Sequence, residues 1–126
     1  MKMNEYQRRA RITAIYPKEL KVIYQALGLA GEAGEVCEKI KKVMRGDLAE
    51  EIKSNKQSVS KWFDNAGKLQ RESNARIGKE LGDVLWYVAN LATDLGLDLD
   101  DIATKNIDKL RDRERRNVLQ GDGDDR

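Results

Sequence analysis

Apolar residues recur at alternating steps of four and three positions along much of this chain, which is the spacing of one face of a helix. The longest such stretch begins after Pro17, a residue suited to a first helical turn, and ends at Gly46. Its apolar positions are Val22, Ala26, Leu29, Ala33, Val36, Ile40 and Val43. This pattern predicts a long helix that packs lengthwise against other helices.

Three further helices are predicted along the chain. One runs over about 76–95 and is ended by Gly96, another runs over about 99–119, and a short one covers 4–14. The stretch 48–75 is polar and lacks the spacing. It predicts a short helix near 48–56, then an irregular or partly helical insertion containing Trp62 and Phe63. Residues 120–126 are typical of a flexible tail.

No segment alternates apolar and polar residues as a strand does, and no linker rich in proline or glycine divides the chain. We therefore predict an all-α fold: one domain over 1–126, built as a helical bundle of about four main helices. A chain of 126 residues, 37% of them charged, buries only a modest core. Small chains often gain core by association, so a homodimer or homotetramer is predicted.

The composition excludes several functional classes. Lysine and arginine number 24 against 22 acidic residues, so no large basic excess indicates a nucleic-acid partner. No run of about 18 apolar residues occurs, which predicts no membrane span. The single cysteine, Cys37, cannot form an internal disulfide; we predict a small core residue in a cytoplasmic protein. Histidine is absent, which excludes a histidine base and histidine-ligated metals.

Two matched pairs of acids are the most informative feature. Glu32 and Glu35 lie three residues apart in one predicted helix, and Glu80 and Asp83 lie three apart in another, so each pair shares a helix face. Both segments follow the pattern Glu-x-Gly-(Glu/Asp)-Val. Each pair lies roughly 90–100° from its apolar stripe, in the same sense of rotation. Helices that pack by these stripes would bring the two pairs face to face.

The glycines around the acids argue against a purely solvated face. Each costs a helix on the order of 1 kcal/mol relative to alanine, which indicates a close approach of backbone, ligand or metal. They are Gly28, Gly31, Gly34, Gly78 and Gly82. Four clustered carboxylates repel one another, and a divalent cation offsets that repulsion. Oxygen ligands without histidine favour Mg²⁺, with Mn²⁺ as a substitute, and hence a phosphorylated substrate. The alternative is that these acids only form salt bridges with Lys39, Lys41, Lys42 and Lys79.

Two longer segments carry a family resemblance. The sequences LGLAGEAGEVCEKIKK (27–42) and KELGDVLWYVANLATDLGL (79–97) resemble the MazG-like all-α nucleotide pyrophosphohydrolases, and NIDKLRDR (106–113) and the tail resemble single-domain phage and prokaryotic members. The resemblance implies an oligomeric Mg²⁺-dependent enzyme that converts (d)NTPs to monophosphates and pyrophosphate. It also implies metal ligands at Glu32, Glu35, Glu80 and Asp83. The 44 residues between the two acid pairs exceed the family's usual spacer.

Further residues are candidates for the chemistry around the metal. Glu38, one turn beyond Glu35, is predicted to orient or deprotonate the attacking water, or else to pair with nearby lysines. Asn106, Lys109 and Arg113 share one face of the last helix and are predicted to clamp phosphates, unless that face is merely solvated.

Aromatic residues flank both acid pairs. Tyr87 lies two turns after Glu80, and Tyr24 lies two turns before Glu32, so both are predicted to contact the substrate, the latter by stacking on the base. Core or interface packing is the alternative for both. Trp86 is predicted to face away from the acids.

Two other functions stay open on the sequence. The same fold could host a phosphoribosyl-nucleotide pyrophosphohydrolase. The heptad-like stripes also fit a non-catalytic helical adaptor, although an adaptor leaves the glycines beside the acids unexplained.

Overall fold

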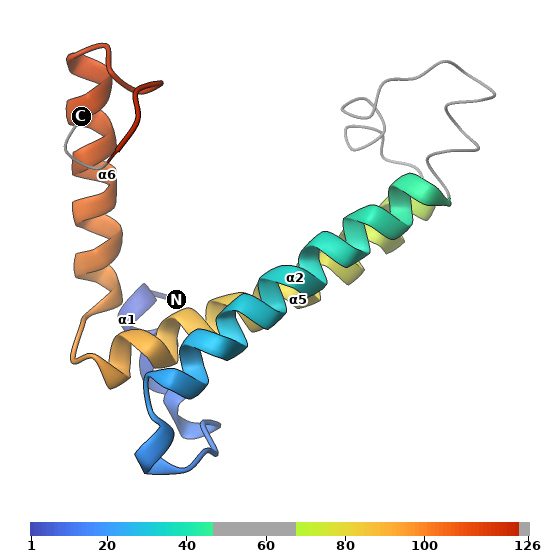
Figure 1. The fold of residues 1–126 in the computed structure, drawn as a ribbon, viewed down its shortest axis with the longest axis horizontal. Helices are drawn as coiled ribbons and strands as arrows, with labels where there is room; N and C mark the ends of the chain where they lie inside the picture. The colour runs from blue at the N-terminus through green and yellow to red at the C-terminus, as the bar shows by residue number, and fades with distance from the viewer. Residues whose placement is uncertain (47–67, 124–126) are drawn as a thin grey trace. The chain divides into compact units, whose positions relative to one another are not determined.

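The computed structural model describes residues 1–46 and 68–123, and in these residues the fold is all-helical, as predicted (Figure 1). Its elements are α1 (Met3–Ile12), a short 3-10 helix η1 (Lys18–Leu20), α2 (Ile23–Arg45), α5 (Lys68–Asp94) and α6 (Leu99–Arg115). None of these helices is both long and apolar enough to cross a membrane. The predicted helix near 48–56 and the residues Trp62 and Phe63 lie outside the described ranges.

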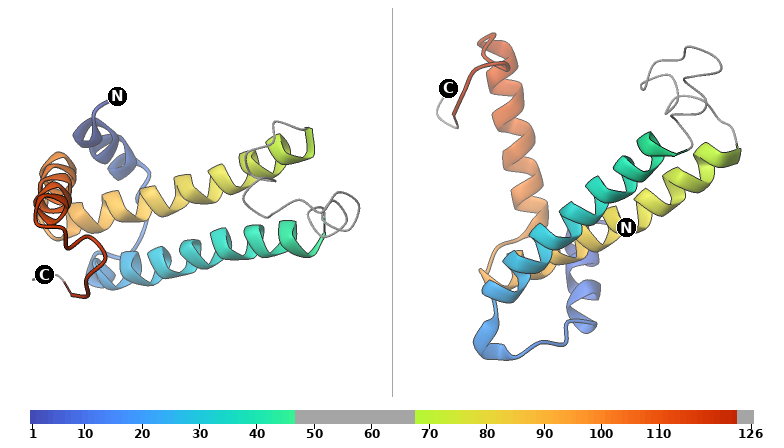
Figure 2. Two further views of the ribbon diagram at one scale, coloured as in Figure 1. Left: turned by 90° about the horizontal axis from the view of Figure 1, so that it is seen from above. Right: turned by 45° about the vertical axis from the view of Figure 1, so that its right-hand side comes forward.

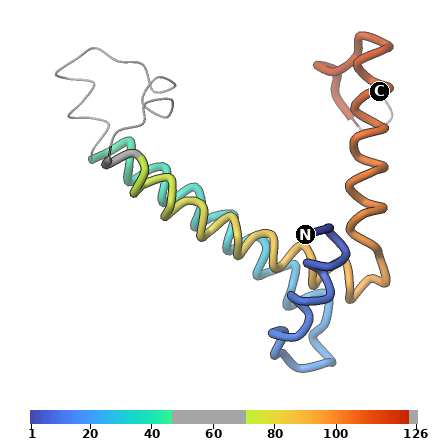
Figure 3. Tube along the Cα trace, turned by 180° about the vertical axis from the view of Figure 1, so that it is seen from behind, coloured from blue at the N-terminus to red at the C-terminus, as the bar shows by residue number. Residues whose placement is uncertain are grey.

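The chain divides into two compact units. One unit comprises Tyr16–Val88, and the other comprises Met1–Ile15 together with Ala89–Arg126. In the first unit, α2 and α5 run antiparallel and side by side, as both views of Figure 2 and the trace in Figure 3 show. This helical pair carries both predicted acid pairs.

The face of α2 that packs in this unit coincides in part with the predicted stripe. Val36 of that stripe is half-buried and Val43 is 5% exposed, whereas its alanines Ala26 and Ala33 are exposed. Outside the stripe, Gln25 is fully buried and Glu32 is half-buried. The helix is therefore turned so that Glu32 enters the contact and the two alanines do not. The missing side chain of Gly28 on that side permits this close approach.

Local backbone chemistry sets the helix boundaries in the first unit. Pro17 caps η1 and does not start α2, which begins only after Val22. Val22 has a φ of 69° and is the central residue of a γ-turn, in which the amide of Ile23 donates to Lys21 O at 2.8 Å. α2 ends before Gly46, as predicted. α5 begins at Lys68, eight residues earlier than the apolar spacing predicts, so residues 68–75 of the predicted irregular or partly helical insertion are helical.

The ends of α5 and α6 share one type of cap. Gly96 has a φ of 70°, and the amides of Gly96 and Leu97 donate back to Thr93 O and Ala92 O at 3.1 and 2.8 Å. Asn117, with a φ of 54°, does the same after α6. These are Schellman caps with a left-handed residue just beyond the helix. The cap at Asn117 explains why α6 ends at Arg115, before the predicted 119.

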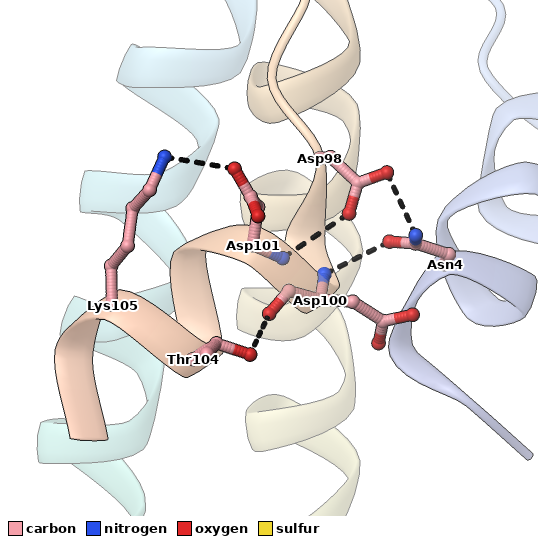
Figure 4. Close-up of polar contacts among 6 residues, drawn as sticks. All are labelled: Asn4, Asp98, Asp100, Asp101, Thr104 and Lys105. Atoms are coloured by element: carbon pink, nitrogen blue, oxygen red, sulfur yellow. Dashed lines mark hydrogen bonds and ion pairs between the residues drawn. The ribbon is translucent and has the colours of Figure 1, made fainter. Parts of the chain in front are cut away.

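In the second unit, two amide side chains of α1 hold the turn between α5 and α6. Gln7 donates to Leu97 O at 2.8 Å and accepts from the amide of Leu99 at 3.0 Å. Asn4 accepts from the amide of Asp100 at 2.9 Å and donates to Asp98 Oδ2 at 2.7 Å (Figure 4). Asp98 also caps α6. These bonds satisfy amides that a helix start leaves without intrahelical partners.

Candidate active site

Three acids from two helices meet in the first unit. Glu32 of α2 and Glu80 and Asp83 of α5 each offer a carboxylate oxygen, and these oxygens lie within 4.8 Å of one another. Glu80 and Asp83 are one turn apart on α5, so both project toward the same side of α2. We call these residues the acid trio. Three of the four predicted metal ligands thus come together, whereas Glu35 is exposed and lies outside the trio.

The environment of the trio disfavours three simultaneous negative charges. Burial raises the pKa of Glu32 above its usual 4.5, and the charges of Asp83, Glu80 and Glu35 raise it further. Glu35 therefore acts on the site electrostatically even though its side chain lies outside the trio. A group of oxygen ligands whose mutual repulsion a cation would relieve fits a hard divalent metal ion such as Mg²⁺.

The raised pKa of Glu32 predicts how pH and charge affect stability. Because the folded protein binds this proton more tightly than the unfolded chain, the metal-free protein loses stability as pH rises from 4.5 through the folded pKa. We expect Glu32→Gln, which removes the charge at nearly constant size, to raise the Tm in EDTA at pH 7. The gain should shrink below pH 4.5, where the wild-type residue is protonated as well.

With added Mg²⁺ the wild type should become more stable than Glu32→Gln, because Mg²⁺ stabilises only a protein that binds it. At 100 times its Kd a ligand contributes about 2.7 kcal/mol. The wild type should gain this stability and Glu32→Gln should not, as thermal unfolding with and without Mg²⁺ will show. A metal-free Glu32→Gln protein that is less stable than the wild type at pH 7 would contradict the electrostatic account.

Lysines of α2 neutralise part of the acidic region. Lys39 Nζ lies 3.3 Å from Glu80 Oε1, across the two helices. Glu38 is paired with Lys41 and lies 3.7 Å from Lys42, and the hydrogen bond from Lys41 lowers its pKa. Salt bridges, the simpler alternative, thus account for Glu38. They do not account for the trio, because Glu32 and Asp83 have no cationic partner in the described part of the chain.

A row of aromatic rings lies in the same unit as the acid trio. Tyr16 stacks on Tyr24 with ring centroids 5.2 Å apart, Tyr24 lies 6.5 Å from Tyr87, and Trp86 meets Tyr87 edge-on at 4.9 Å. Burial raises the pKa of Tyr87, as do Tyr24 and the negative charge of Glu32. The Tyr87 hydroxyl is also hydrogen-bonded to Tyr24, so the two tyrosines form one polar contact beside Glu32.

The glycines of the two helices differ in their surroundings. A Cβ built on Gly28 would lie 2.0 Å from the ring of Tyr87, so the predicted close approach is real at this position. Gly31, Gly34, Gly78 and Gly82 have nothing within 4 Å of such an atom among the described residues.

Cys37 is exposed, which corrects the prediction that it is a core residue. It lies on the α2 face turned away from the acid trio.

The predicted phosphate clamp belongs to the second unit. Asn106 and Lys109 are exposed on α6. Arg113 is only 4% exposed, and its guanidinium donates to Gly123 O at 3.3 Å, so it ties the tail to the helix. A role of these three residues in substrate binding stays a prediction.

Lys39 is one of the lysines named in the salt-bridge alternative, and its pairing with Glu80 bears out that alternative for one acid of the trio. Tyr16 was not singled out from the sequence. It lies at a bend before η1, and helical periodicity gives no signal for its contact with Tyr24.

Comparisons with known proteins indicate the family of this chain. Residues 64–118 match the family described as the MazG nucleotide pyrophosphohydrolase domain, a span that includes Glu80 and Asp83. The chain is also 36% identical over 132 residues to the Gene 37 protein of Mycobacterium phage L5, with both chains covered in full. No solved structure matches the chain.

Proposed function

The chain belongs to the MazG nucleotide pyrophosphohydrolase family, and from this we propose that it hydrolyses nucleoside triphosphates, (d)NTP, to monophosphate and pyrophosphate with Mg²⁺ as cofactor. The observation that carries the proposal is the acid trio, with three carboxylate oxygens within 4.8 Å on two packed helices. Such a set of oxygen ligands suits Mg²⁺, which usually takes its remaining ligands from water and substrate phosphates.

Each residue of the site has a proposed role in this reaction. Glu32, Glu80 and Asp83 would hold the metal, with Glu35 as the fourth predicted ligand from the adjacent turn. When bound, Mg²⁺ supplies positive charge to the phosphate oxygens and lowers the pKa of a coordinated water. The Tyr87 hydroxyl would exchange its hydrogen bond with Tyr24 for one to a phosphate oxygen, and Tyr24 would offer its ring to the base.

The reaction balances without any further reactant. A water oxygen forms a bond to phosphorus, the bridging oxygen between the α- and β-phosphates leaves with the pyrophosphate, and the water's proton passes to solvent or a carboxylate. Glu38 is the proposed acceptor. Its pairing with Lys41 holds it ionised, although its lowered pKa also makes it a weak base.

The test is a product assay on the full chain with Mg²⁺ and a panel of canonical and modified NTPs and dNTPs. Pyrophosphate and orthophosphate are quantified separately. Pyrophosphate without orthophosphate supports the proposal and ranks the substrates. Orthophosphate alone would refute the reaction type. Activity on phosphoribosyl-nucleotides alone would move the protein to that chemistry, and inactivity on every substrate with either Mg²⁺ or Mn²⁺ would favour an adaptor.

We also propose that the active protein is a homodimer or homotetramer. Large apolar side chains of both helices are exposed: Ile23 at 60%, Leu27 at 70% and Leu81 at 52%. Gly31 and Gly78, which have open space beside them among the described residues, would let another helix approach closely. A second copy of this chain presents the same apolar residues and can cover them.

Light scattering coupled to size exclusion is expected to give a mass of two or four chains. Leu27→Glu, which places a charge on the exposed apolar face, should shift this mass toward the monomer. Leu119→Glu, at a side chain 47% exposed in the second unit, is the matched control. A monomeric wild type at micromolar concentration would contradict the assembly.

A further inference from the structure

A basic pocket lies beside the acid trio, in the same unit. It is a cavity of about 370 Å³ lined by Lys39, Lys42, Val43, Ser73 and Arg76. Three of these five residues are cationic. Val43 and Ser73 are 5% and 1% exposed, so they form a packed base beneath the charged groups. The pocket is therefore built from both helices of the unit and is not a solvated stripe on one of them.

The positive charge of the pocket is only partly neutralised. Lys39 is engaged with Glu80, and Lys42 reaches Glu38 only at 3.7 Å. Arg76 donates to the hydroxyl of Ser73 at 3.2 Å, and no acidic partner of Arg76 occurs in residues 1–46 and 68–123. A guanidinium has five donors in a planar fork, so most of those of Arg76 are available to a ligand. This fork matches the oxygens of a phosphate group.

The pocket adjoins the acid trio through the residues that line it. Lys39 contacts Glu80 of the trio directly. Arg76 precedes Glu80 by four residues, which is about 6 Å along α5. A ligand with several phosphate groups could therefore place one group at the trio and another in the pocket.

We propose that the basic pocket binds a phosphate-type anion, with Arg76 and Lys42 as its ligands. The inference rests on the proposed function in one respect, since the nucleotide or its pyrophosphate product would supply this anion. Lys39 lies between the two sites and can exchange its partner from Glu80 to the anion when the carboxylate binds a cation. The sequence alone did not single out this site.

The test measures binding of inorganic pyrophosphate to the full chain by calorimetry in the presence of Mg²⁺. Hydrogen bonds to charged groups contribute about 1.5–3 kcal/mol, which corresponds to roughly a 10- to 100-fold change in Kd. We expect Arg76→Gln to raise the Kd for pyrophosphate by an amount within this range, and Lys42→Gln to raise it by about 10-fold. The Lys42 side chain is 55% exposed, so its substitution does not endanger folding. Arg71→Gln, an exposed residue of the same helix, should leave the Kd unchanged.

A competition arm separates the two sources of the anion. If a non-hydrolysable nucleoside triphosphate displaces pyrophosphate from the wild type, the pocket holds the phosphates of the nucleotide. If both bind together, the pocket holds a free anion, and the inference stands in that form.

Different experimental results would refute the pocket assignment and the proposed function. Pyrophosphate that does not bind the wild type, or that binds Arg76→Gln and Lys42→Gln with unchanged Kd, overturns the pocket assignment even in an active enzyme. Absence of hydrolysis, with pyrophosphate binding weakened as expected in both variants, overturns the proposed function and leaves the pocket in place.

Discussion

Replacing Glu80 by alanine is expected to lower kcat/KM for pyrophosphate release by at least about 100-fold, because loss of a residue that merely supports a metal ligand already costs 10- to 100-fold. Glu80 has two connections in the site, one to the acid trio and one to Lys39 at 3.3 Å. Its removal takes away a metal ligand and leaves the Lys39 ammonium beside the remaining two acids. Both changes weaken binding of a divalent cation.

The measurement combines initial rates over a range of Mg²⁺ concentrations with thermal unfolding of the same samples. Glu80→Ala should lose activity and also the Mg²⁺-dependent rise in Tm. Glu19→Ala, at an exposed acid of the same unit, should keep both. If Glu80→Ala retains wild-type kcat/KM, the acid trio is not the metal site and the proposed mechanism fails.

Gly28→Ala is expected to destabilise the protein, although alanine is the better helix former. A Cβ at this position would lie 2.0, 2.3 and 2.6 Å from three ring atoms of Tyr87. That ring cannot move aside freely, because Tyr24 and Trp86 contact it. Overpacking of this kind costs about 1–3 kcal/mol, which exceeds the gain of about 1 kcal/mol from helix propensity. We expect the Tm to fall by about 4 °C for each kcal/mol.

A second glycine of the same helix serves as the matched control. A Cβ at Gly34 meets nothing within 4 Å among the described residues, so Gly34→Ala should raise stability by about 0.5–1 kcal/mol. Urea unfolding of the three variants decides the sign. Stabilisation by Gly28→Ala would mean that the Tyr87 ring does not lie against α2. Gly31→Ala should not stabilise the protein in this way, because a second chain is proposed to approach α2 at Gly31.

These two variants also show where sequence reasoning succeeded. The glycines and acids were recognised because helical periodicity is local: it depends only on spacing along the chain and on residue type. The predicted helix end at Gly96 also depends on a local feature, since only glycine adopts a left-handed conformation without strain. The boundary at Asn117 carried a weaker signal, because asparagine enters this region less often than glycine.

The chemistry of the candidate site was largely readable from composition. A chain without histidine, in which two helices each carry paired acids, has only oxygen ligands to offer a metal there. Which acids meet was not readable. The apolar stripe predicted four ligands at the edge of the contact, and the structure brings together three, with Glu35 exposed.

The sequence by itself thus determined the helical class, most helix ends and the residue types of the candidate site, because each depends on neighbours within one or two turns. Only the tertiary structure decided how α2 is rotated against α5, and with it the acid trio, the pairing of Lys39 with Glu80, and the basic pocket at Arg76. Periodicity orients side chains about their own helix axis. The rotation and register of two packed helices depend on which side chains fit between them, and here the ring of Tyr87 fits against Gly28.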